Sequence, residues 1–594
     1  MSATRVAVAD PEISTGRPPL DPLRRTLLVG AAWLLLYAFG PGIASPGGSP
    51  WPVPVALALW AHGASRPGRL AFSVESVLAC AAWCGVCSWA AKVHWTSLLF
   101  IGPGFGLYYA SAGALLRRLG RCLPLALAAP AAWMAVEALR TLLEPPFGLS
   151  WMRLGIHVHE VPWLAGSARV WGVWGLSFAL AALGGLLADL GGHGFSGRST
   201  PRGGWKLALA AGLGPVAAAV VLSLATSAPA TERGPRGMLV QPAIPQERKM
   251  RQQTASELFL SGFHLTRDGL AEAAQAGEAP VDFVAWGESM LPIPILDPGL
   301  PAAVAAGARS PDWSPEDWAP ETLEAAKDAE HDYIQCGLVN ADPKRPGLLP
   351  RGTAFLSGAL VYLARDGAIR RQGGVAVWGA DGTRAGTVGK LHLVPGAETM
   401  LGLERFGFVR STIHQLAGYV PDLVAHEGSR RLAFTTRAGR EVVFGASVCF
   451  DNSYDGTFVL PLAEGPVDFH LVSSNEAWFR GDQEQDQMMA FSHLAAIASG
   501  RAIVRATNSG ITAVVGPDGR DVARLRVGGR DREVAGTLRA DVPVPTATER
   551  SRTTFYARSW RFWPLALLLW PWVLLAVART LGPRRSPAGT QGRG

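Results

Sequence analysis

Long apolar runs alternate with short polar segments over the first 227 residues. Runs of about 20 residues, the length that crosses a bilayer as a helix, lie at 26–45, 70–91, 96–116, 122–141, 171–190 and 205–227. A shorter run lies at 51–65, and none of comparable length follows until Phe562 to Ala578. The pattern predicts seven membrane spans, one large polar domain and one last span.

Short β-type runs alternate with helical, Ala-rich stretches in the polar domain. We expect strands at 236–241, 281–286, 333–339, 354–364, 440–450, 467–475, 501–508 and 511–519. We expect helices at 249–275, 316–329 and 484–499. Inserts around 300–320 and 370–386 are rich in Pro, Gly and charge and are expected to be surface loops. The alternation predicts a layered α/β domain with a sheet buried on both faces.

The distribution of Lys and Arg predicts how the chain is oriented. The two tails and the loops on their side hold 16 of these residues, whereas the opposite short loops hold 4. Because the richer side stays in the cytoplasm, both termini are expected there and the polar domain on the outer face. The first run lacks a cleavage site and is expected to be retained. The expected boundaries are 1–25, 26–227, 228–558, 559–581 and 582–594, for a tail, seven spans, the outer domain, the last span and a tail.

Composition supports a membrane protein. Charged residues make up 17% of the chain and hydrophobic residues 48%, which excludes a disordered, collagen-like or small disulfide-stapled protein. The net charge of +8 comes from residues that flank the apolar runs. The excess of positive charge is therefore explained by the orientation of the chain in the membrane, and no nucleic-acid partner is expected.

Cysteines and charges inside the apolar runs leave alternatives open. Cys84 and Cys87 have the spacing of a redox or metal pair, but on an apolar helix packing is favoured. Glu137 and Arg140 share a helix face and form either a self-satisfied pair or a polar contact with the outer domain or a lipid headgroup. Glu75 is a second charge that needs a partner.

The two cysteines of the outer domain allow a disulfide or two separate roles. Cys336 and Cys449 both follow strand-like apolar runs. A disulfide between them is possible outside the cytoplasm. A buried Cys336 and a separate reactive Cys449 are favoured by their positions after strands.

Three apolar runs of the outer domain are followed at once by reactive side chains. These are Glu288 after VDFVAWG, Lys390 after TVG and Cys449 after VVFGASV. If they converge, Glu288 can deprotonate the thiol, and Lys390 with the backbone amide of Phe450 can hold an oxyanion. The three residues therefore form a candidate apparatus for acyl transfer.

The strings around these residues resemble the nitrilase superfamily, and together with the apolar runs they resemble bacterial apolipoprotein N-acyltransferases. In the outer domain the resemblance rests on LVQPAIPQERK, WGES, KLHLVPGAE, SVCFD, SSNEAWF and RAIVRATNSGITAVVGPDG. Among the spans it rests on PAAWMAVEALR, FGLSWMRLG and GVWGLSF. It implies a polytopic helical domain of about eight spans, arranged 7+1, with a nitrilase-like αββα sandwich inserted before the last span.

The resemblance assigns roles to residues of this chain. Glu288 matches the general base, Lys390 the catalytic lysine, Cys449 the nucleophile, and Glu398 a glutamate that orients Lys390 or the base. The chain departs from the family at Gly287, where the family has Pro, and this is expected to loosen the turn that presents Glu288. Further matching positions near the pocket are Phe450, Asp451, Asn475 and Trp478.

The reaction implied by the resemblance moves a fatty acyl chain in two steps. The thiol takes the chain from a membrane phospholipid and passes it to the α-amine of the diacylated N-terminal cysteine of an apolipoprotein. No metal and no soluble cofactor are implied, and a monomer in the bacterial inner membrane is expected, with its catalytic domain on the periplasmic face. Two alternatives stay open: a membrane-tethered amidase with the same three residues, and a non-catalytic binding relative.

Overall fold

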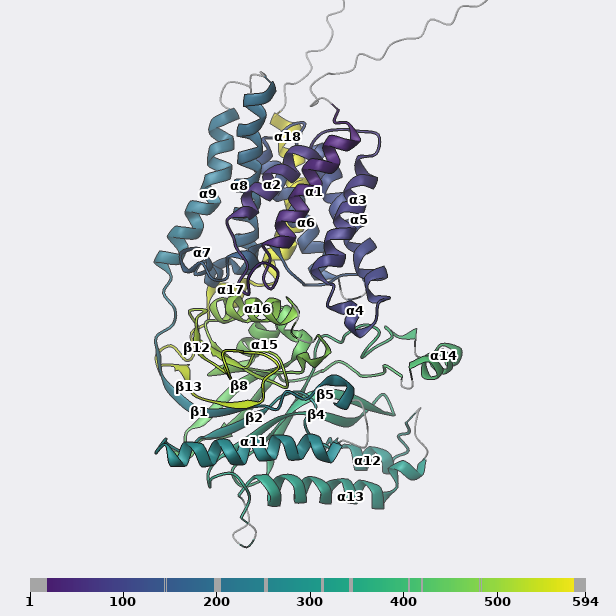
Figure 1. Cartoon of the computed structure of the whole chain (residues 1–594), viewed down its shortest axis with the longest axis vertical. Helices are drawn as coiled ribbons and strands as arrows, with labels where there is room; N and C mark the ends of the chain where they lie inside the picture. Colours follow the sequence, from purple (N-terminus) through teal and green to yellow (C-terminus); the bar gives the residue numbers. More distant parts are fainter. Residues whose placement is uncertain are drawn as a thin grey trace, which may run out of the picture.

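The computed structural model describes most of the chain between its two tails. The described residues are 19–581 without 144, 146, 197–203, 250–254, 311–314, 341–343, 345, 404–405, 418–419, 480 and 482. The tail 582–594 and most of the tail 1–25 lie outside them. A bundle of helices stands on an α/β domain, and Figure 1 shows the two parts one above the other.

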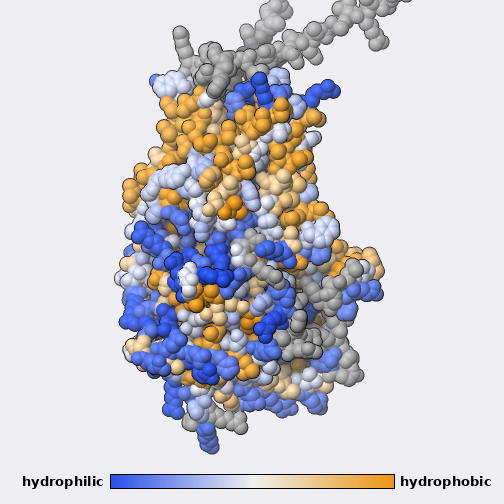
Figure 2. All heavy atoms as spheres, in the orientation of Figure 1, coloured by the Kyte–Doolittle hydropathy of each residue, from blue (hydrophilic) through white to orange (hydrophobic). Residues whose placement is uncertain are grey.

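Each apolar run of the sequence forms a helix. The helices are α1 (Pro22–Ala38), α2 (Pro52–Ala64), α3 (Ala71–Val86), α5 (Ser97–Leu119), α6 (Leu125–Leu142), α8 (Ala168–Ser196), α9 (Gly204–Ala225) and α18 (Phe562–Leu581). Among the described helices, five are long and apolar enough to cross a membrane: Ser97–Leu119, Leu125–Leu142, Ala168–Gly191, Gly204–Ala225 and Phe562–Thr580. Figure 2 shows hydrophobic residues over this bundle and hydrophilic residues over the α/β domain.

Small residues let these helices approach one another and the domain below. Gly172 in α8 has a φ of +61°, and a Cβ there would lie 2.4 Å from the Tyr556 ring of α17 (Phe555–Ser559). Glycine alone accepts both the positive φ and the close approach. The kink at Gly172 therefore creates the space into which α17 packs. The short helices α4 (Ala90–Val93), η1 (Leu154–Val158) and α7 (Pro162–Ala165) complete the bundle.

Buried charges in the bundle have partners within the protein. Glu75 binds Arg25 at 2.6 Å and Arg117 at 2.7 Å. Glu137 lies 3.9 Å from Arg140 and accepts hydrogen bonds from Trp133 and the Leu154 amide. Arg140 donates to backbone carbonyls at 149–152. The Glu137–Arg140 pair is thus weak by itself and serves mainly to hold the 149–154 loop.

Two sheets pack face to face below the bundle. One has the order β13-β1-β2-β4-β5-β6 with β3 beside β4, and the other the order β12-β11-β10-β9-β8-β7. The Phe283 ring of the first sheet stacks 6.0 Å from the Phe469 ring of the second. The strands are β1 (Thr231–Gln241), β2 (Phe283–Trp286), β3 (Ile295–Leu296), β4 (Ala354–Arg365), β5 (Ala368–Trp378), β6 (Arg384–Gly389), β7 (Arg431–Thr435), β8 (Glu441–Val448), β9 (Phe469–Ser474), β10 (Ala502–Thr507), β11 (Ala513–Val515), β12 (Asp521–Arg524) and β13 (Gly536–Pro545).

Helices cover both outer faces of the sandwich. Residues of α11 (Ala255–Gln275) join the core on the first sheet, and α15 (Gly456–Glu464) and α16 (Gln483–Ser499) that on the second. The αββα order agrees with the expectation from the sequence. The other helices of this domain are α10 (Gln246–Lys249), α12 (Leu300–Ala305), η3 (Pro315–Trp318), α13 (Pro320–Glu330), η4 (His331–Leu338), α14 (Gly407–Ala417), η6 (Cys449–Ser453) and η7 (Glu476–Trp478).

Three expectations for the outer domain are wrong. The insert around 300–320 is not only a loop, because its described residues include α12 and η3, and Leu300 joins a buried cluster. The insert 370–386 is not a surface loop, because its first part belongs to β5, which pairs with β4, and its last part belongs to β6, which pairs with β5. The run 333–339 is not a strand, because residues 333–338 lie in the π-helix η4, which continues α13 without a break. Cys336 is therefore half-buried on a helix instead of buried after a strand.

Helix α16 joins the α/β domain to the bundle. The Gln483 side chain donates to the Gly85 and Val86 carbonyls at 2.7 and 2.9 Å. The Gln487 carbonyl oxygen accepts hydrogen bonds from the indoles of Trp89 and Trp151. Helix α16 thus covers the second sheet on one side and contacts the helical bundle on the other.

Candidate active site

The reactive side chains converge at one end of the sandwich. Glu288 follows β2 and Lys390 follows β6, both in the first sheet, and Cys449 follows β8 in the second. The site therefore lies where the two sheets face each other, and its three residues come from different strands. The Lys390 side chain is 2% exposed and the Glu288 side chain 15% exposed, so both charges are largely removed from water.

Lys390 is held between two carboxylates. Its Nζ lies 2.8 Å from Oε1 of Glu398 and 3.9 Å from Oε1 of Glu288. Oε2 of Glu398 accepts a hydrogen bond of 2.8 Å from the Val394 amide. Glu398 therefore holds the Lys390 ammonium close to the loop that contains Val394. Glu288 makes the longer of the two contacts to the ammonium.

Cys449 sits in a backbone conformation that side chains rarely adopt. Its φ is +47°, and the residue is 8% exposed. Such strain is found at functional sites that the surrounding structure holds in place. The buried Asp451 carboxylate holds this turn, since it accepts from the amides of Val448, Leu391 and His392. The same carboxylate thus ties the Cys449 turn to the segment after Lys390.

Burial and neighbouring charges determine how the three groups ionise. Burial, with the Glu288 charge, raises the pKa of Cys449 well above its usual value, while Lys390 acts to lower it. Burial also raises the pKa of Glu288 against the attraction of Lys390. Burial by itself lowers the pKa of Lys390, but Glu398 and Glu288 outweigh it and raise this pKa. The thiol is therefore protonated at neutral pH and needs a base, and the lysine stays charged.

The other residues expected near the pocket have different surroundings. The Asn475 amide donates to Glu288, and its side chain bonds Gln246 and Asn508 at 2.8 and 2.9 Å. The Phe450 ring stacks 6.2 Å from Trp151 of the bundle. Trp478 is half-buried in η7, next to Phe479, whose ring lies 5.0 Å from Trp89. Asn475 thus touches the site, while Phe450 faces the membrane helices.

Gly287 does not loosen the turn before Glu288. A Cβ on Gly287 would lie 2.8 Å from the Asn508 backbone nitrogen, and one on Gly358 would lie 2.4 Å from the Glu288 Cα. Both distances are shorter than real side chains allow. The turn is therefore enclosed by backbone on two sides, which explains why glycine stands where the resemblance leads one to expect proline.

Lys249 is a charged residue of the pocket that the sequence analysis did not single out. Its Nζ donates to the Glu288 backbone carbonyl at 2.7 Å. Burial lowers the pKa of Lys249 to about 8, opposed by Glu288 and Cys449. Lys249 is the last residue of LVQPAIPQERK, one of the strings that resemble the family. This position in the string is the sequence feature that could have indicated its role. The pocket thus contains two lysines.

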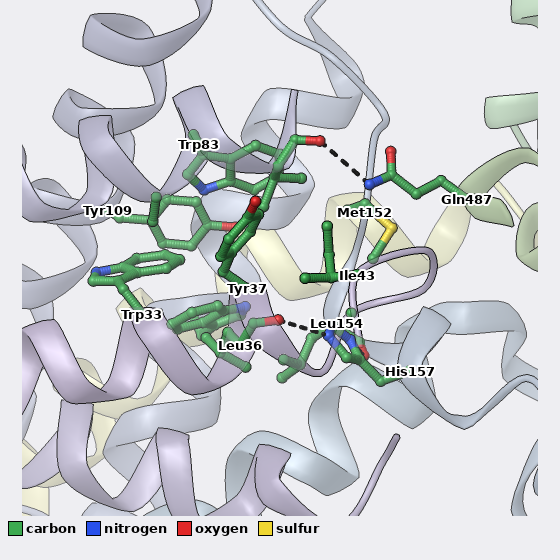
Figure 3. Close-up of a pocket in the computed structure, with 14 residues that line it drawn as sticks. Trp33, Leu36, Tyr37, Ile43, Trp83, Tyr109, Met152, Leu154, His157 and Gln487 are labelled. Atoms are coloured by element: carbon green, nitrogen blue, oxygen red, sulfur yellow. Dashed lines mark hydrogen bonds between the residues drawn. The ribbon is translucent and has the colours of Figure 1, made fainter. Parts of the chain in front are cut away.

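A small apolar cavity lies in the bundle just above α16. It measures about 40 Å³, and Figure 3 shows Trp83, Tyr109 and Tyr37 around it with Gln487 reaching in from α16. Its polar edges are bound, since Gln487 donates to the Val86 carbonyl and His157 contacts the Leu36 carbonyl. The cavity therefore lies at the junction between the bundle and α16.

The cysteines form no disulfide, and one metal-capable group lies elsewhere. All six cysteines are free, so Cys336 and Cys449 are separate. Cys84 and Cys80 line the point where α3 meets Gly102 of α5, as helix packing requires. Among the described residues, one group has ligand atoms within 4.8 Å, namely His331, Asp332 and Cys336. It lies on η4, away from Glu288, Lys390 and Cys449 at the ends of β2, β6 and β8.

Comparison with protein families matches both halves of the chain. The family described as "Apolipoprotein N-acyltransferase N-terminal domain" matches residues 29–186, and "Carbon-nitrogen hydrolase" matches residues 360–550. The second match contains Lys390 and Cys449, and Glu288 lies before it. Among solved structures, an amidase from Nesterenkonia sp. is 16% identical, with 53% of this chain and 94% of that chain covered and a TM-score of 0.28. The family matches, rather than this TM-score, identify the nitrilase-like domain.

Curated relatives share most of their length with this chain. A protein of Azotobacter vinelandii named "Apolipoprotein N-acyltransferase" is 30% identical over 77% of this chain and 75% of its own. Proteins of the same name from Pseudomonas paraeruginosa and Rhodopseudomonas palustris are 28% and 25% identical, over 81% and 73% of this chain and 81% and 70% of theirs. These matches extend over more of the chain than either the helical part or the α/β domain alone. The chain belongs to the apolipoprotein N-acyltransferase family.

Proposed function

We propose that the protein transfers a fatty acyl chain from a membrane phospholipid to the N-terminal α-amine of a diacylated apolipoprotein, by way of a thioester on Cys449. The observation that carries this proposal is that Cys449, Glu288 and Lys390 converge below a bundle of apolar helices, with the Phe450 ring beside Trp151 of that bundle. Membership of the family supplies the nature of both substrates.

In the first step Cys449 takes the acyl chain. Glu288 accepts the thiol proton as the sulfur attacks the ester carbonyl, and Lys390 holds the oxyanion that forms. The ester C–O bond then breaks, and the departing alkoxide of the lysophospholipid takes the proton from Glu288. The step leaves a Cys449 thioester and a neutral lysophospholipid alcohol.

In the second step the amine of the apolipoprotein attacks the thioester. Glu288 accepts a proton from the attacking amine, and Lys390 again holds the oxyanion. The C–S bond breaks, the sulfur regains a proton from Glu288, and the product is an amide. The enzyme returns to its starting state, which makes the cycle ping-pong.

The membrane arrangement follows from the same proposal. All eight apolar helices span the inner membrane in a 7+1 order, with boundaries near 26–227 and 559–581. The α/β domain of 228–558 then lies on the periplasmic face, where both lipid-anchored substrates reach Cys449. The active unit is a monomer, and no nucleic acid takes part.

The intact mass of the detergent-purified protein tests the function. Incubated with phospholipid and no acceptor, the protein is expected to gain one fatty acyl mass that maps to Cys449, because no amine is present to remove it. The adduct is expected to disappear when a diacylated lipopeptide is added. Mass spectrometry before and after that addition measures both steps.

Cys449→Ala is the control, since it removes the nucleophile and no other group. Release of free fatty acid without a stable adduct would instead indicate the amidase alternative, in which water takes the acyl chain. An adduct of equal yield in Cys449→Ala would contradict the assignment of the nucleophile.

The pH dependence of adduct formation tests the second lysine. Lys249 holds the Glu288 backbone and adds positive charge near the thiol, and its pKa is about 8. Single-turnover rates are therefore expected to fall as pH rises through about 8, and also as pH falls through the raised pKa of Glu288, where the base is protonated. Arginine stays charged over this range, so Lys249→Arg is expected to lose the alkaline fall alone. Identical profiles in parent and variant would exclude Lys249 from the reaction.

A further inference from the structure

A second pocket lies where the last apolar helix leaves the α/β domain. Its volume is about 440 Å³, and it is lined by α15, by α17 and by the first residues of α18. None of the residues described in the catalytic pocket lines it. Figure 1 shows α17 between the helical bundle and the α/β domain. The pocket is therefore a separate feature at the level where the bundle meets the α/β domain.

One side of the pocket is apolar. Leu460 and Leu462 of α15 face Trp560 and Phe562, and Phe562 is 62% exposed. Trp560 also packs on α15, because a Cβ on Gly456 would lie 3.3 Å from its ring. From Phe562 the exposed apolar surface continues along α18. The pocket is thus continuous with a surface that hydrocarbon covers in a membrane.

The other side carries two arginines. Arg558 and Arg561 line the pocket and are exposed, and no carboxylate among the described residues forms an ion pair with either. Arg561 lies 5.1 Å from the Trp560 ring centre. The pocket lining contains no Asp or Glu, and the adjacent Glu464 accepts hydrogen bonds from Ser429 and the Arg430 amide. The charge of this pocket is therefore positive and uncompensated.

We propose that this pocket binds an anionic phospholipid, with its phosphate between Arg558 and Arg561 and an acyl chain along Leu460, Leu462 and Phe562. Guanidinium groups match phosphate geometry, and the apolar wall requires a ligand that also carries a hydrocarbon chain. A zwitterionic headgroup is disfavoured because its ammonium finds no carboxylate in the lining. The inference goes beyond the acyl transfer proposed above and does not depend on it.

The position of the aromatic residues agrees with a headgroup site. Trp560 lies just before α18 and Trp563 in its first turn, and the Trp563 indole donates to the Ser559 hydroxyl at 3.1 Å. Tryptophans at the end of an apolar helix are typical of the membrane–water interface. A phosphate held by Arg558 and Arg561 would lie at this level, with its chains beside α18.

Native mass spectrometry of the full-length Cys449→Ala protein tests the proposal, since this background cannot consume the lipid. Phosphatidylglycerol and phosphatidylethanolamine with the same chains are compared in the parent and in Arg558→Gln/Arg561→Gln. Two arginines near an anionic lipid predict about 30-fold weaker retention of phosphatidylglycerol in the double variant. Retention of phosphatidylethanolamine is expected to change little. The catalytic pocket is the same in both proteins, so the difference reports the second pocket.

Arg579→Gln is the matched control, because Arg579 is an exposed arginine in the last turn of α18, at the other end of that helix from the pocket. It is expected to retain phosphatidylglycerol like the parent. Equal retention of phosphatidylglycerol in parent and double variant, or an equal loss of both lipids in the double variant, would overturn the proposal. Displacement of the lipid by millimolar inorganic phosphate would also overturn it, because the site would then take a free anion. If thermal unfolding shows that the double variant does not fold, the two single variants decide.

Discussion

Replacing Glu288 with glutamine is expected to slow formation of the Cys449 adduct by about 10²- to 10⁴-fold, the range for losing a general base. The thiol has a raised pKa, so almost none of it is ionised at neutral pH, and attack requires a group that takes its proton. Glu288 has a raised pKa, which makes it a stronger base than an exposed carboxylate. Glutamine keeps the size of the side chain but accepts no proton.

Glu398→Gln is the matched control for this experiment. It changes the same chemical group at the other carboxylate of Lys390, and it leaves the base in place. One of its two hydrogen bonds, to Lys390 or to the Val394 amide, is lost, which predicts a loss of about tenfold. Single-turnover adduct formation, followed by intact mass, separates the two variants. A Glu288→Gln rate within threefold of the parent would show that another group deprotonates Cys449.

The sequence predicted the positions of the reactive groups because each follows directly on a strand. Glu288, Lys390 and Cys449 end apolar runs, and the ends of neighbouring strands meet at the edges of sheets. It also predicted the apolar helices, because a run of about 20 apolar residues has the length of a helix that crosses a bilayer. The local pattern of apolar residues is sufficient to predict the structure of a segment where that segment alone determines the environment of its residues.

Features that depend on tertiary contact were not predictable in this way. The β5–β6 hairpin is Gly- and Arg-rich, and its strand character comes from eleven paired positions against β4. The Lys249 ammonium reaches a backbone carbonyl 39 residues away. The pairing of Gln483 with the end of α3 spans almost 400 residues. In each case the contacting residue lies in a distant segment of the chain. The pattern of apolar and polar residues within one segment cannot predict such a contact.

Replacing Lys390 with alanine is expected to slow adduct formation by about 10²- to 10³-fold, the effect of removing one oxyanion donor. Lys390 is the cation nearest to both Glu288 and Glu398, and its own raised pKa keeps it charged throughout the reaction. The variant also leaves two carboxylates without their shared cation. The pKa of Glu288 is therefore expected to rise further, so the acid fall in rate moves to higher pH.

This second effect distinguishes Lys390 from a residue that only supports the fold. A structural loss would reduce the amount of active protein equally at every pH, whereas loss of the cation changes the shape of the profile. Lys390→Arg keeps the charge but places it differently, so it is expected to preserve the acid limb while remaining slower than the parent. Thermal unfolding in detergent verifies that both variants are folded. If Lys390→Ala keeps a rate within threefold of the parent and an unchanged profile, the oxyanion is held by backbone amides of the Cys449 turn and not by this lysine.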